Sequence, residues 1–269
     1  MPELPEVETT FRAIEKFKGR TLLKIKINNR NLRWKVDKSI EIKAKNQKIL
    51  DIKRRAKYII IELKDTYLLM HLGMSGNLRI AKKNDNYFLK HDHIEFIFEK
   101  ERIIYNDPRR FGSLHITKDI ENHKLIRNLG PEPLSRSFNS NYLFNLCFES
   151  KTNIKTLLMN QKNVVGIGNI YASETLFLAK IHPLKEANKI NIDDCKLIVN
   201  SSKKVLRAAI KLGGTTLKDF YSADGNPGYF KIKLNVYGRE DLKCNKCNSK
   251  IKKVNVNNRA TFYCLTCQS

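Results

Sequence analysis

The chain opens with the apolar pattern of an amphipathic helix. Apolar residues recur at spacings of four, three and three, at Val7, Phe11, Ile14 and Phe17. Pro5 suits the first turn of such a helix, where no backbone N–H is needed, and Gly19 ends the pattern. We therefore predict an N-terminal helix that anchors the first residues of the chain against a core.

The pattern changes to that of β-strands from Leu22 to about Thr117. Short apolar runs, several of them alternating with polar residues, make up the strand candidates, which are residues 23–27, 40–42, 50–52, 58–63, 67–72, 94–98, 103–105 and 114–116. Many short strands without intervening helices indicate an antiparallel sandwich or barrel rather than a doubly wound α/β fold.

The second half of the chain has a helical pattern. It follows a connection at residues 129–134 that contains one glycine and two prolines. The helix candidates are residues 142–148, 154–159, 169–178, 193–212 and 215–221. Asn169 and Asp193 are placed as N-caps of the third and fourth helices, and Gly213-Gly214 ends the fourth.

The charge of the chain favours a polyanionic partner. There are 51 Lys and Arg residues against 27 Asp and Glu, a formal net charge of +24. Nucleic acid is the first candidate for such a surface, although coding bias toward Lys, Asn and Ile can also raise the charge. No run approaches the roughly 20 apolar residues of a membrane span, and the N-terminus lacks a secretory leader pattern. We expect a soluble cytoplasmic protein that does not bind membranes.

Four of the six cysteines predict a metal site. Cys244 and Cys247 form one C-x-x-C pair, Cys264 and Cys267 form another, and sixteen residues separate the pairs. This spacing is typical of a four-cysteine zinc ribbon, and four thiolates leave no open position on the metal. We therefore expect one structural Zn²⁺ within a basic hairpin that faces a phosphate backbone. The remaining two, Cys147 and Cys195, are expected to be small buried residues.

Pro2 and Glu3 allow two interpretations. If Met1 is trimmed, Pro2 becomes an N-terminal secondary amine, which titrates near ~8 and is partly unprotonated at neutral pH. Such an amine can condense with a sugar aldehyde to give a cationic iminium, and Glu3 beside it could move protons. The alternative is that Pro2 only begins the chain and Pro5 only begins a helix.

Four further segments could have functional roles. Asp107 to Gly112 joins two strands, and its Phe111 either projects beside Arg109 as a wedge for an opened duplex or packs inward. Met74 stands between two glycines, where a core methionine is unusual. His91 and His93 resemble a metal pair, but no third ligand is evident. Gly166 to Tyr171 is a glycine turn that enters a helix, a weak signal for phosphate binding.

Together these segments resemble the bacterial formamidopyrimidine-DNA glycosylase family, which repairs oxidised purines such as 8-oxoguanine. The resemblance spans the whole chain in order. The segments that carry it are residues 2–8, 54–58, 71–76, 107–112, 164–174, 213–220, 224–230 and the cysteine hairpin with residues 259–264. One departure is Ser150, because the family commonly has a basic residue just before Lys151.

The resemblance implies an α+β multidomain fold. It comprises an N-terminal antiparallel β-sandwich with an N-terminal helix, a helical helix-two-turn-helix domain and a four-cysteine zinc-finger β-hairpin. We expect residues 1–131 to form the catalytic sandwich domain and residues 132–222 the helix-two-turn-helix domain. Residues 223–234 would be a lesion-capping loop and linker, and residues 235–269 the zinc finger.

The resemblance also implies roles for individual residues. Pro2 would be the Schiff-base nucleophile that attacks the deoxyribose C1′ of an extruded damaged nucleotide, and Glu3 the proton donor. Lys57 and Arg259 match the residues assigned to β- and δ-elimination. Met74, Arg109 and Phe111 match the residues that fill the void in the duplex. The other expected DNA contacts are His71, His91, Lys151, Lys155, Asn169, Lys218 and Tyr237.

The expected partner is therefore double-stranded DNA that carries a damaged base, bound by a monomer in the bacterial nucleoid. No redox or organic cofactor is needed for this chemistry. Two alternatives remain at this point. One is an endonuclease VIII-like glycosylase for oxidised pyrimidines, against which Leu4 and the Arg109–Phe111 segment argue. The other is a non-catalytic zinc-ribbon protein that binds nucleic acid, which gives no reason for Pro2 and Glu3.

Overall fold

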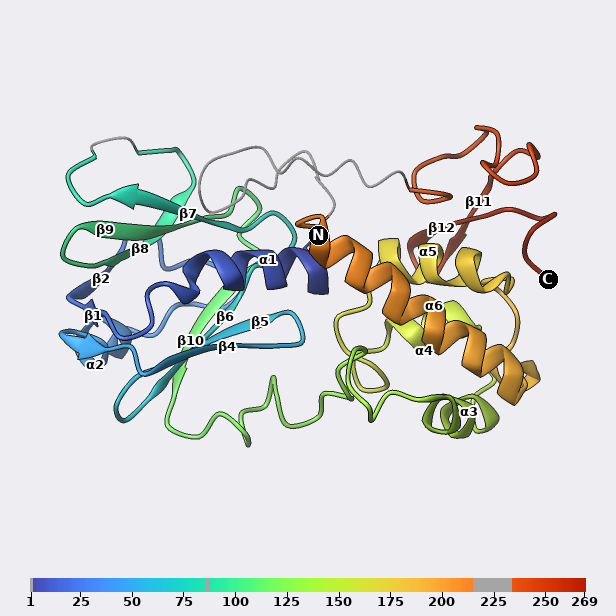
Figure 1. Cartoon of the computed structure of the whole chain (residues 1–269). Helices are drawn as coiled ribbons and strands as arrows, with labels where there is room; N and C mark the ends of the chain where they lie inside the picture. Colours follow the sequence, from blue (N-terminus) through green and yellow to red (C-terminus); the bar gives the residue numbers. More distant parts are fainter. Residues whose placement is uncertain (1, 86–87, 215–233) are drawn as a thin grey trace. The chain divides into compact units, whose positions relative to one another are not determined.

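The computed structural model of the chain describes residues 2–85, 88–214 and 234–269 (Figure 1). These residues fall into two compact units. The first comprises residues 2–127 and takes up the chain again from Leu212, whereas the second comprises Asn128–Lys211 and the C-terminal residues through Ser269.

The first unit is built on two antiparallel four-stranded sheets. One has the order β2-β8-β9-β7 and the other the order β10-β6-β5-β4. Their strands are β2 (Lys24–Ile27), β4 (Asp51–Arg55), β5 (Tyr58–Glu62), β6 (Tyr67–His71), β7 (Asn77–Lys82), β8 (Asp92–Ile97), β9 (Glu101–Asn106) and β10 (Ser113–Thr117). The short strands β1 (Thr21–Leu22) and β3 (Gln47–Lys48) pair separately, and the helices are α1 (Leu4–Glu15) and α2 (Ser39–Lys43).

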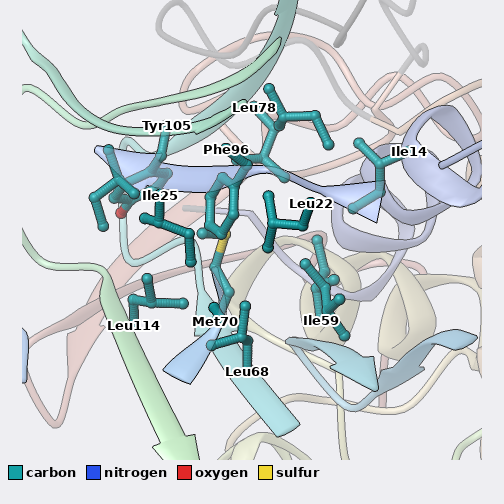
Figure 2. Packing of buried hydrophobic residues seen from close by; sticks show 14 of the residues in the cluster. Ile14, Leu22, Ile25, Ile59, Leu68, Met70, Leu78, Phe96, Tyr105 and Leu114 are labelled. Carbon is teal, nitrogen blue, oxygen red and sulfur yellow. The ribbon is translucent and has the colours of Figure 1, made fainter. Parts of the chain in front are cut away.

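Both sheets and helix α1 contribute to one hydrophobic core. Phe96 and Tyr105 from the first sheet point toward Met70 and Leu114 from the second, and Ile14 of α1 closes one side (Figure 2). All five side chains are almost completely buried. The predicted antiparallel sandwich with an N-terminal helix is therefore confirmed.

Two details of the first unit differ from the prediction. Residues 40–42 were expected to form a strand but lie in α2, where Ile40 is buried and Ile42 is 79% exposed. Ile40 and Ala44 are both buried at the helical spacing of four, and the Asp37 carboxylate accepts a hydrogen bond from the Ser39 N–H at the helix start. Strand β7 was not predicted because Asn77 and Arg79 interrupt its apolar run.

The second unit is mainly helical and ends in a β-hairpin. Its elements are α3 (Ser140–Phe148), α4 (Ile154–Met159), α5 (Asn169–Ala179), the 3₁₀ helix η1 (Ala187–Lys189), α6 (Ile192–Lys211), β11 (Lys252–Val256) and β12 (Arg259–Tyr263). The helices share one apolar core, and a smaller core joins Phe177 of α5 to Phe262 of the hairpin. The zinc-finger hairpin is therefore packed on α5.

Both predicted N-caps are wrong by one or two residues. Helix α5 begins at Asn169 with Gly168 as its N-cap, because the Asn169 side chain is bonded to Lys155 and Ala260 instead. Helix α6 begins at Ile192, and the Asn191 side chain accepts a hydrogen bond from Asp194 N at 2.8 Å. Asn191 therefore takes the capping role predicted for Asp193.

Several expectations lie outside the described residues. They concern the helix at 215–221, Lys218 and the lesion-capping loop. The three boundaries between the four predicted domains also stay predictions. In the described ranges, none of the helices is both long enough and apolar enough to cross a membrane.

Candidate active site and nucleic-acid interface

The first residues of the chain are fixed by the start of α1. Pro2 is buried, and Glu3 is the N-cap residue with only 2% of its surface exposed. The fully buried Glu6 side chain accepts a hydrogen bond from Glu3 N at 2.8 Å, as part of a capping box. This reciprocal cap holds the backbone that carries Pro2 and Glu3, as a positioned nucleophile and acid would require.

Helix α1 is tied to the turn that carries Lys57. The Arg54 guanidinium forms an ion pair with Glu8 of α1 at 2.6 Å and donates to the Ala56 carbonyl at 2.9 Å. Ala56 and Lys57 form the two-residue turn between β4 and β5, with Ala56 in the left-handed region at φ 55°. Lys57 is only 7% exposed, which is unusual for a lysine at a hairpin tip.

His71 is a neutral imidazole of defined tautomer. Burial and the positive charges of Lys57 and Arg33 lower the pKa of His71 to about 4. Its Nδ1 accepts a hydrogen bond from Gly73 N at 3.0 Å, so the proton of the neutral ring is on Nε2. The ring can therefore donate one hydrogen bond to an anion without carrying a charge.

The buried Asp107 carboxylate organises the segment that carries Arg109 and Phe111. It accepts hydrogen bonds from Ser75 Oγ at 2.6 Å, from the Tyr105 hydroxyl at 2.9 Å and from Gly112 N at 2.9 Å. Burial and Asp107 raise the pKa of Tyr105, which keeps that hydroxyl protonated as a donor. Ser75 lies next to Met74, so one carboxylate holds both predicted wedge loops.

Close backbone packing brings the two wedge loops together. A Cβ atom at Gly73 would overlap the backbone of Phe111 and Gly112, and Gly73 has a left-handed φ of 71°. Phe111 is 43% exposed, with the Arg109 guanidinium 5.0 Å from its ring centroid. The inward-packed interpretation of Phe111 is therefore wrong, and Met74, Arg109 and Phe111 come from neighbouring loops.

Among the described residues, His91 and His93 have no third ligand with which they could hold a metal ion. His93 Nε2 is bonded to the Asp107 carbonyl oxygen at 2.8 Å, and the His91 carbonyl accepts from Asp107 N at 3.1 Å. Within the described ranges, the four cysteines are the group of His, Cys, Asp and Glu side chains close enough to hold a metal ion. His91 and His93 instead support the turn at Asp107.

In the second unit, Lys155 joins the start of α5 to the zinc-finger hairpin. Its amino group donates to Asn169 Oδ1 at 2.6 Å, to Thr261 Oγ1 at 2.7 Å and to the Ala260 carbonyl at 3.2 Å. Asn169 Nδ2 also donates to that carbonyl at 2.9 Å. Lys155 is 2% exposed, so its predicted phosphate contact stays a prediction, and its present contacts orient Asn169.

Arg259 is exposed at the tip of the hairpin. Asn257 and Asn258 form the turn with φ values of 49° and 58°, the left-handed conformation that two-residue hairpins favour. A pocket of about 320 Å³ lies between α4 and this tip, with Arg259 and Lys155 in its lining. Arg259 thus extends from a rigid two-stranded support into an open site.

The four predicted metal ligands converge. Their sulfur atoms all lie within 4.8 Å of one another, with Cys247–Cys264 at 3.4 Å and Cys244–Cys267 at 4.0 Å. A tetrahedral Zn²⁺ site with bonds of about 2.3 Å needs sulfur–sulfur distances of about 3.8 Å. Burial raises the pKa of Cys267 to about 12, whereas hydrogen bonds from Ser249 lower that of Cys247 to about 6. A divalent cation would hold all four as thiolates, so these residues fit zinc.

The remaining predicted DNA contacts have simpler surroundings. Tyr237 is half-buried, and its ring packs edge-on against that of Phe262, with the ring centroids 5.1 Å apart. Lys151 is exposed just before α4. Lys218 lies outside the described residues.

A helix-bearing β-sandwich followed by a helical unit and a four-cysteine hairpin defines the class of helix-two-turn-helix DNA glycosylases. Three sequence profiles match the chain in order. They are the formamidopyrimidine-DNA glycosylase N-terminal domain at residues 1–114, the H2TH domain of the same enzymes at 129–221, and the zinc finger found in FPG and IleRS at 241–269. The chain belongs to the formamidopyrimidine-DNA glycosylase family, which confirms the resemblance.

Similar proteins cover the chain from end to end. Formamidopyrimidine-DNA glycosylase of Hydrogenovibrio crunogenus is 50% identical over 271 residues, covering 100% of this chain and 96% of that protein. The Escherichia coli protein of the same name (strain 55989 / EAEC) is 47% identical and fully covered. A solved complex of Lactococcus lactis Fpg with DNA containing an abasic site has a TM-score of 0.91, 36% identity and 99% coverage of both chains. The MutM (Fpg) protein of Thermus thermophilus has a TM-score of 0.89 and 34% identity, covering 99% of this chain and 98% of that one.

Some residues that organise the site were missed by sequence reasoning. Glu6, Arg54 and Tyr105 act through other side chains, and nothing in the local pattern separates them from ordinary helix or strand residues. The sequence signal for Asp107 was present, because an aspartate before Pro-Arg-Arg is typical of a turn. Its contacts to Ser75 depend on pairing between distant strands.

Proposed function

We propose that this protein is a bifunctional DNA glycosylase and abasic-site lyase that excises oxidised purines from double-stranded DNA. The observation that carries the proposal is the buried Pro2–Glu3 pair, held at the start of α1 by the Glu6 cap. A chain that only bound DNA would have no use for a rigidly positioned terminal amine and a buried carboxyl group. Family membership supports the same activity.

The proposed reaction begins at the terminal nitrogen of Pro2 after removal of Met1. This nitrogen attacks C1′ of the extruded deoxyribose and loses its proton, while the damaged base leaves with a proton. Glu3 protonates the ring oxygen as the sugar opens, which gives an iminium ion between Pro2 and C1′. The positive nitrogen then acts as the electron sink for the later steps.

Strand cleavage follows by two eliminations. Loss of the C2′ proton expels the 3′ phosphate, and loss of the C4′ proton expels the 5′ phosphate. We assign the first step to Lys57 and the second to Arg259, following the family resemblance. Water then hydrolyses the iminium and releases Pro2. The placement of Lys57 favours this assignment, because the residue is buried in a turn that Arg54 ties to Glu8 of α1.

The DNA contacts divide into void filling and phosphate binding. Met74, Arg109 and Phe111 would replace the extruded nucleotide, which costs a few kcal/mol to unstack. The neutral His71 would donate Nε2–H to a phosphate oxygen. The further proposed phosphate contacts are His91, Lys151, Lys155, Asn169, Lys218 and Tyr237, and residues 223–234 would cap the lesion. One structural Zn²⁺ on the four cysteines would hold the hairpin that carries Arg259.

A panel of duplexes tests this function. The protein should release 8-oxoguanine and nick the strand, leaving phosphates on both ends, and borohydride should trap it covalently on the DNA. Excision of oxidised pyrimidines in preference to purines would favour the endonuclease VIII-like alternative. Binding without excision or trapping would favour the non-catalytic one and overturn the proposal.

Two matched proline variants separate the nucleophile from the helix start. Pro2→Leu should retain Met1, block the terminal nitrogen and abolish trapping. Pro5→Ala changes the proline in the first turn of α1 but leaves the terminal amine intact, so trapping should persist. Equal trapping by both variants would assign the covalent bond to another amine.

Replacing Glu3 separates base removal from strand cleavage. Glu3→Gln should lose base excision, because the amide cannot protonate the ring oxygen. It should still be trapped on a preformed abasic site, whose sugar is already an open aldehyde. Full excision by this variant would assign the acid to another residue.

A further inference from the structure

Glu174 is a buried carboxylate that the proposed reaction does not use. It lies in α5 and is only 4% exposed. Glutamate is rarely buried unless paired, so its partners explain how a charged group is accommodated at this position. They belong to a single segment, Asn235–Tyr237, which leads into the zinc finger.

Both oxygens of Glu174 are engaged by this segment. Oε1 accepts from Val236 N at 2.9 Å and from Tyr237 N at 3.0 Å. Oε2 accepts from Asn235 N at 2.9 Å and from Asn235 Nδ2 at 3.0 Å. Three consecutive backbone N–H groups thus converge on one carboxylate, as in a backbone nest that binds an anion.

The same segment is also held from its other side. Arg239 Nη1 donates to the Asn235 carbonyl at 2.7 Å, and Arg239 N donates to the Val236 carbonyl at 3.1 Å. Val236 is fully buried. The backbone next to Tyr237 therefore has little freedom, and the direction of the Tyr237 side chain depends on the Glu174 contacts.

Helix α5 links this nest to Asn169, another proposed phosphate ligand of the second unit. Asn169 begins the helix, and Glu174 follows five residues later, about 7.5 Å along the axis. Asn169 is bonded to the Ala260 carbonyl of the hairpin, and Glu174 to the segment before the hairpin. One rigid helix thus sets the positions of Asn169 and Tyr237 together.

We propose that Glu174 is a positioning residue for DNA binding, whose carboxylate fixes the Asn235–Tyr237 backbone so that the Tyr237 hydroxyl meets a phosphodiester oxygen. This inference rests on the phosphate contact of Tyr237 in the proposed function. Glu174 itself touches no DNA.

A double-mutant cycle tests the coupling. Glu174→Gln keeps the shape of the side chain but places an amide group against backbone N–H donors. Both Glu174→Gln and Tyr237→Phe should weaken binding to a duplex with an uncleavable abasic analogue by about fivefold to tenfold, the worth of one hydrogen bond. The double variant should bind no more than about twofold more weakly than the weaker single variant, because both changes remove the same contact.

Kinetics and zinc content separate positioning from a general loss of structure. Glu174→Gln should raise the KM for abasic DNA and leave kcat and one zinc ion per chain unchanged. Glu186→Gln is the matched control, because Glu186 is an exposed glutamate of the same unit whose carboxylate pairs with the exposed Lys189. Its affinity should stay within about twofold of the wild type. Unchanged affinity in Glu174→Gln, or additive losses in the double variant, would overturn the proposal.

A second variant covers the case in which Glu174→Gln loses zinc. Asn235→Ala removes one side-chain hydrogen bond to Glu174 and leaves the backbone donors in place. It should weaken binding about twofold to threefold, again without additivity to Tyr237→Phe. Additive losses would overturn the proposal, as would a Tyr237→Phe variant that binds normally. Excision and trapping by the wild type report on the proposed function separately.

Discussion

Asp107→Asn should loosen both wedge loops at once, although residue 107 itself is fully buried. The carboxylate accepts from Ser75, Tyr105 and Gly112 at 2.6 to 2.9 Å. An asparagine has one acceptor oxygen, so at least one of these donors must face an amide group. The other bonds lose the extra strength that the charge confers.

The size of this effect follows from the bonds affected. Weakening two or three charge-assisted hydrogen bonds by about 1 kcal/mol each lowers the free energy of unfolding by about 2–3 kcal/mol. A loss of this size lowers Tm by about 4–12 °C in a domain of this size class. Affinity for a duplex with an abasic analogue should also fall, because Met74 and Phe111 no longer share a fixed support.

Thermal unfolding and DNA binding measure the two consequences. Asp65→Asn is the matched control, because Asp65 is exposed in the turn between β5 and β6 and its change should shift Tm by less than about 2 °C. If Asp107→Asn matches Asp65→Asn in both Tm and affinity, the role assigned to the buried carboxylate is refuted.

Three further changes test other parts of the first unit. Gly112→Ala should destabilise the protein more than Gly19→Ala, as thermal unfolding would show. A Cβ at Gly112 overlaps Tyr105, whereas Gly19 has open space and an alanine there costs only the strain of a left-handed φ of 81°, about 1–2 kcal/mol. Equal losses would contradict this. Phe111→Ala should leave Tm within about 2 °C of the wild type, because the side chain is exposed and adds little to folding stability. It should weaken binding to a lesion-containing duplex about tenfold in a gel-shift titration, because the side chain is proposed to fill the void in the DNA. The pKa of His71 is about 4 in the folded protein and about 6.5 in the unfolded chain. The contribution of His71 to the free energy of unfolding is therefore complete above pH 6.5 and is lost as the pH falls to 4, a change of up to about 3 kcal/mol. In urea unfolding across this range, the free energy of unfolding of His71→Asn should depend less steeply on pH than that of the wild type. A slope of the same sign should remain, because the pKa of His115 is also lowered to about 4. An unchanged slope would count against this assignment.

The fold could be predicted to the extent that local periodicity decides it. The N-terminal helix, most strands and the helices of the second unit all carry clear periodic patterns. Residues 40–42 were wrongly predicted as a strand because a polar residue between two isoleucines is compatible with one. The burial of Ala44, which favours a helical turn, is apparent only from the packing. Strand β7 was missed for the opposite reason. Its own residues show no clear strand pattern, and the strand forms by pairing with β9.

The candidate site could be predicted where covalent chemistry fixes residue type and spacing. Four cysteines with metal-ligand spacing and a proline after the start methionine are of this kind. Positioning roles could not be predicted, since Asp107 and Glu174 fix other segments through contacts with residues 32 and 61 to 63 positions away along the chain. Lys155 shows the same limit, because a lysine near other basic residues gives no sign that it is buried.

The central claim is that Pro2 supplies the covalent bond to DNA. The most direct test is to trap the wild-type protein on an abasic duplex with borohydride, digest both components and locate the sugar adduct by mass spectrometry. The account predicts that the adduct is on the peptide that begins at Pro2, with Met1 absent. An adduct on Lys57 or another lysine, or no adduct on a protein that still nicks the strand, would contradict it.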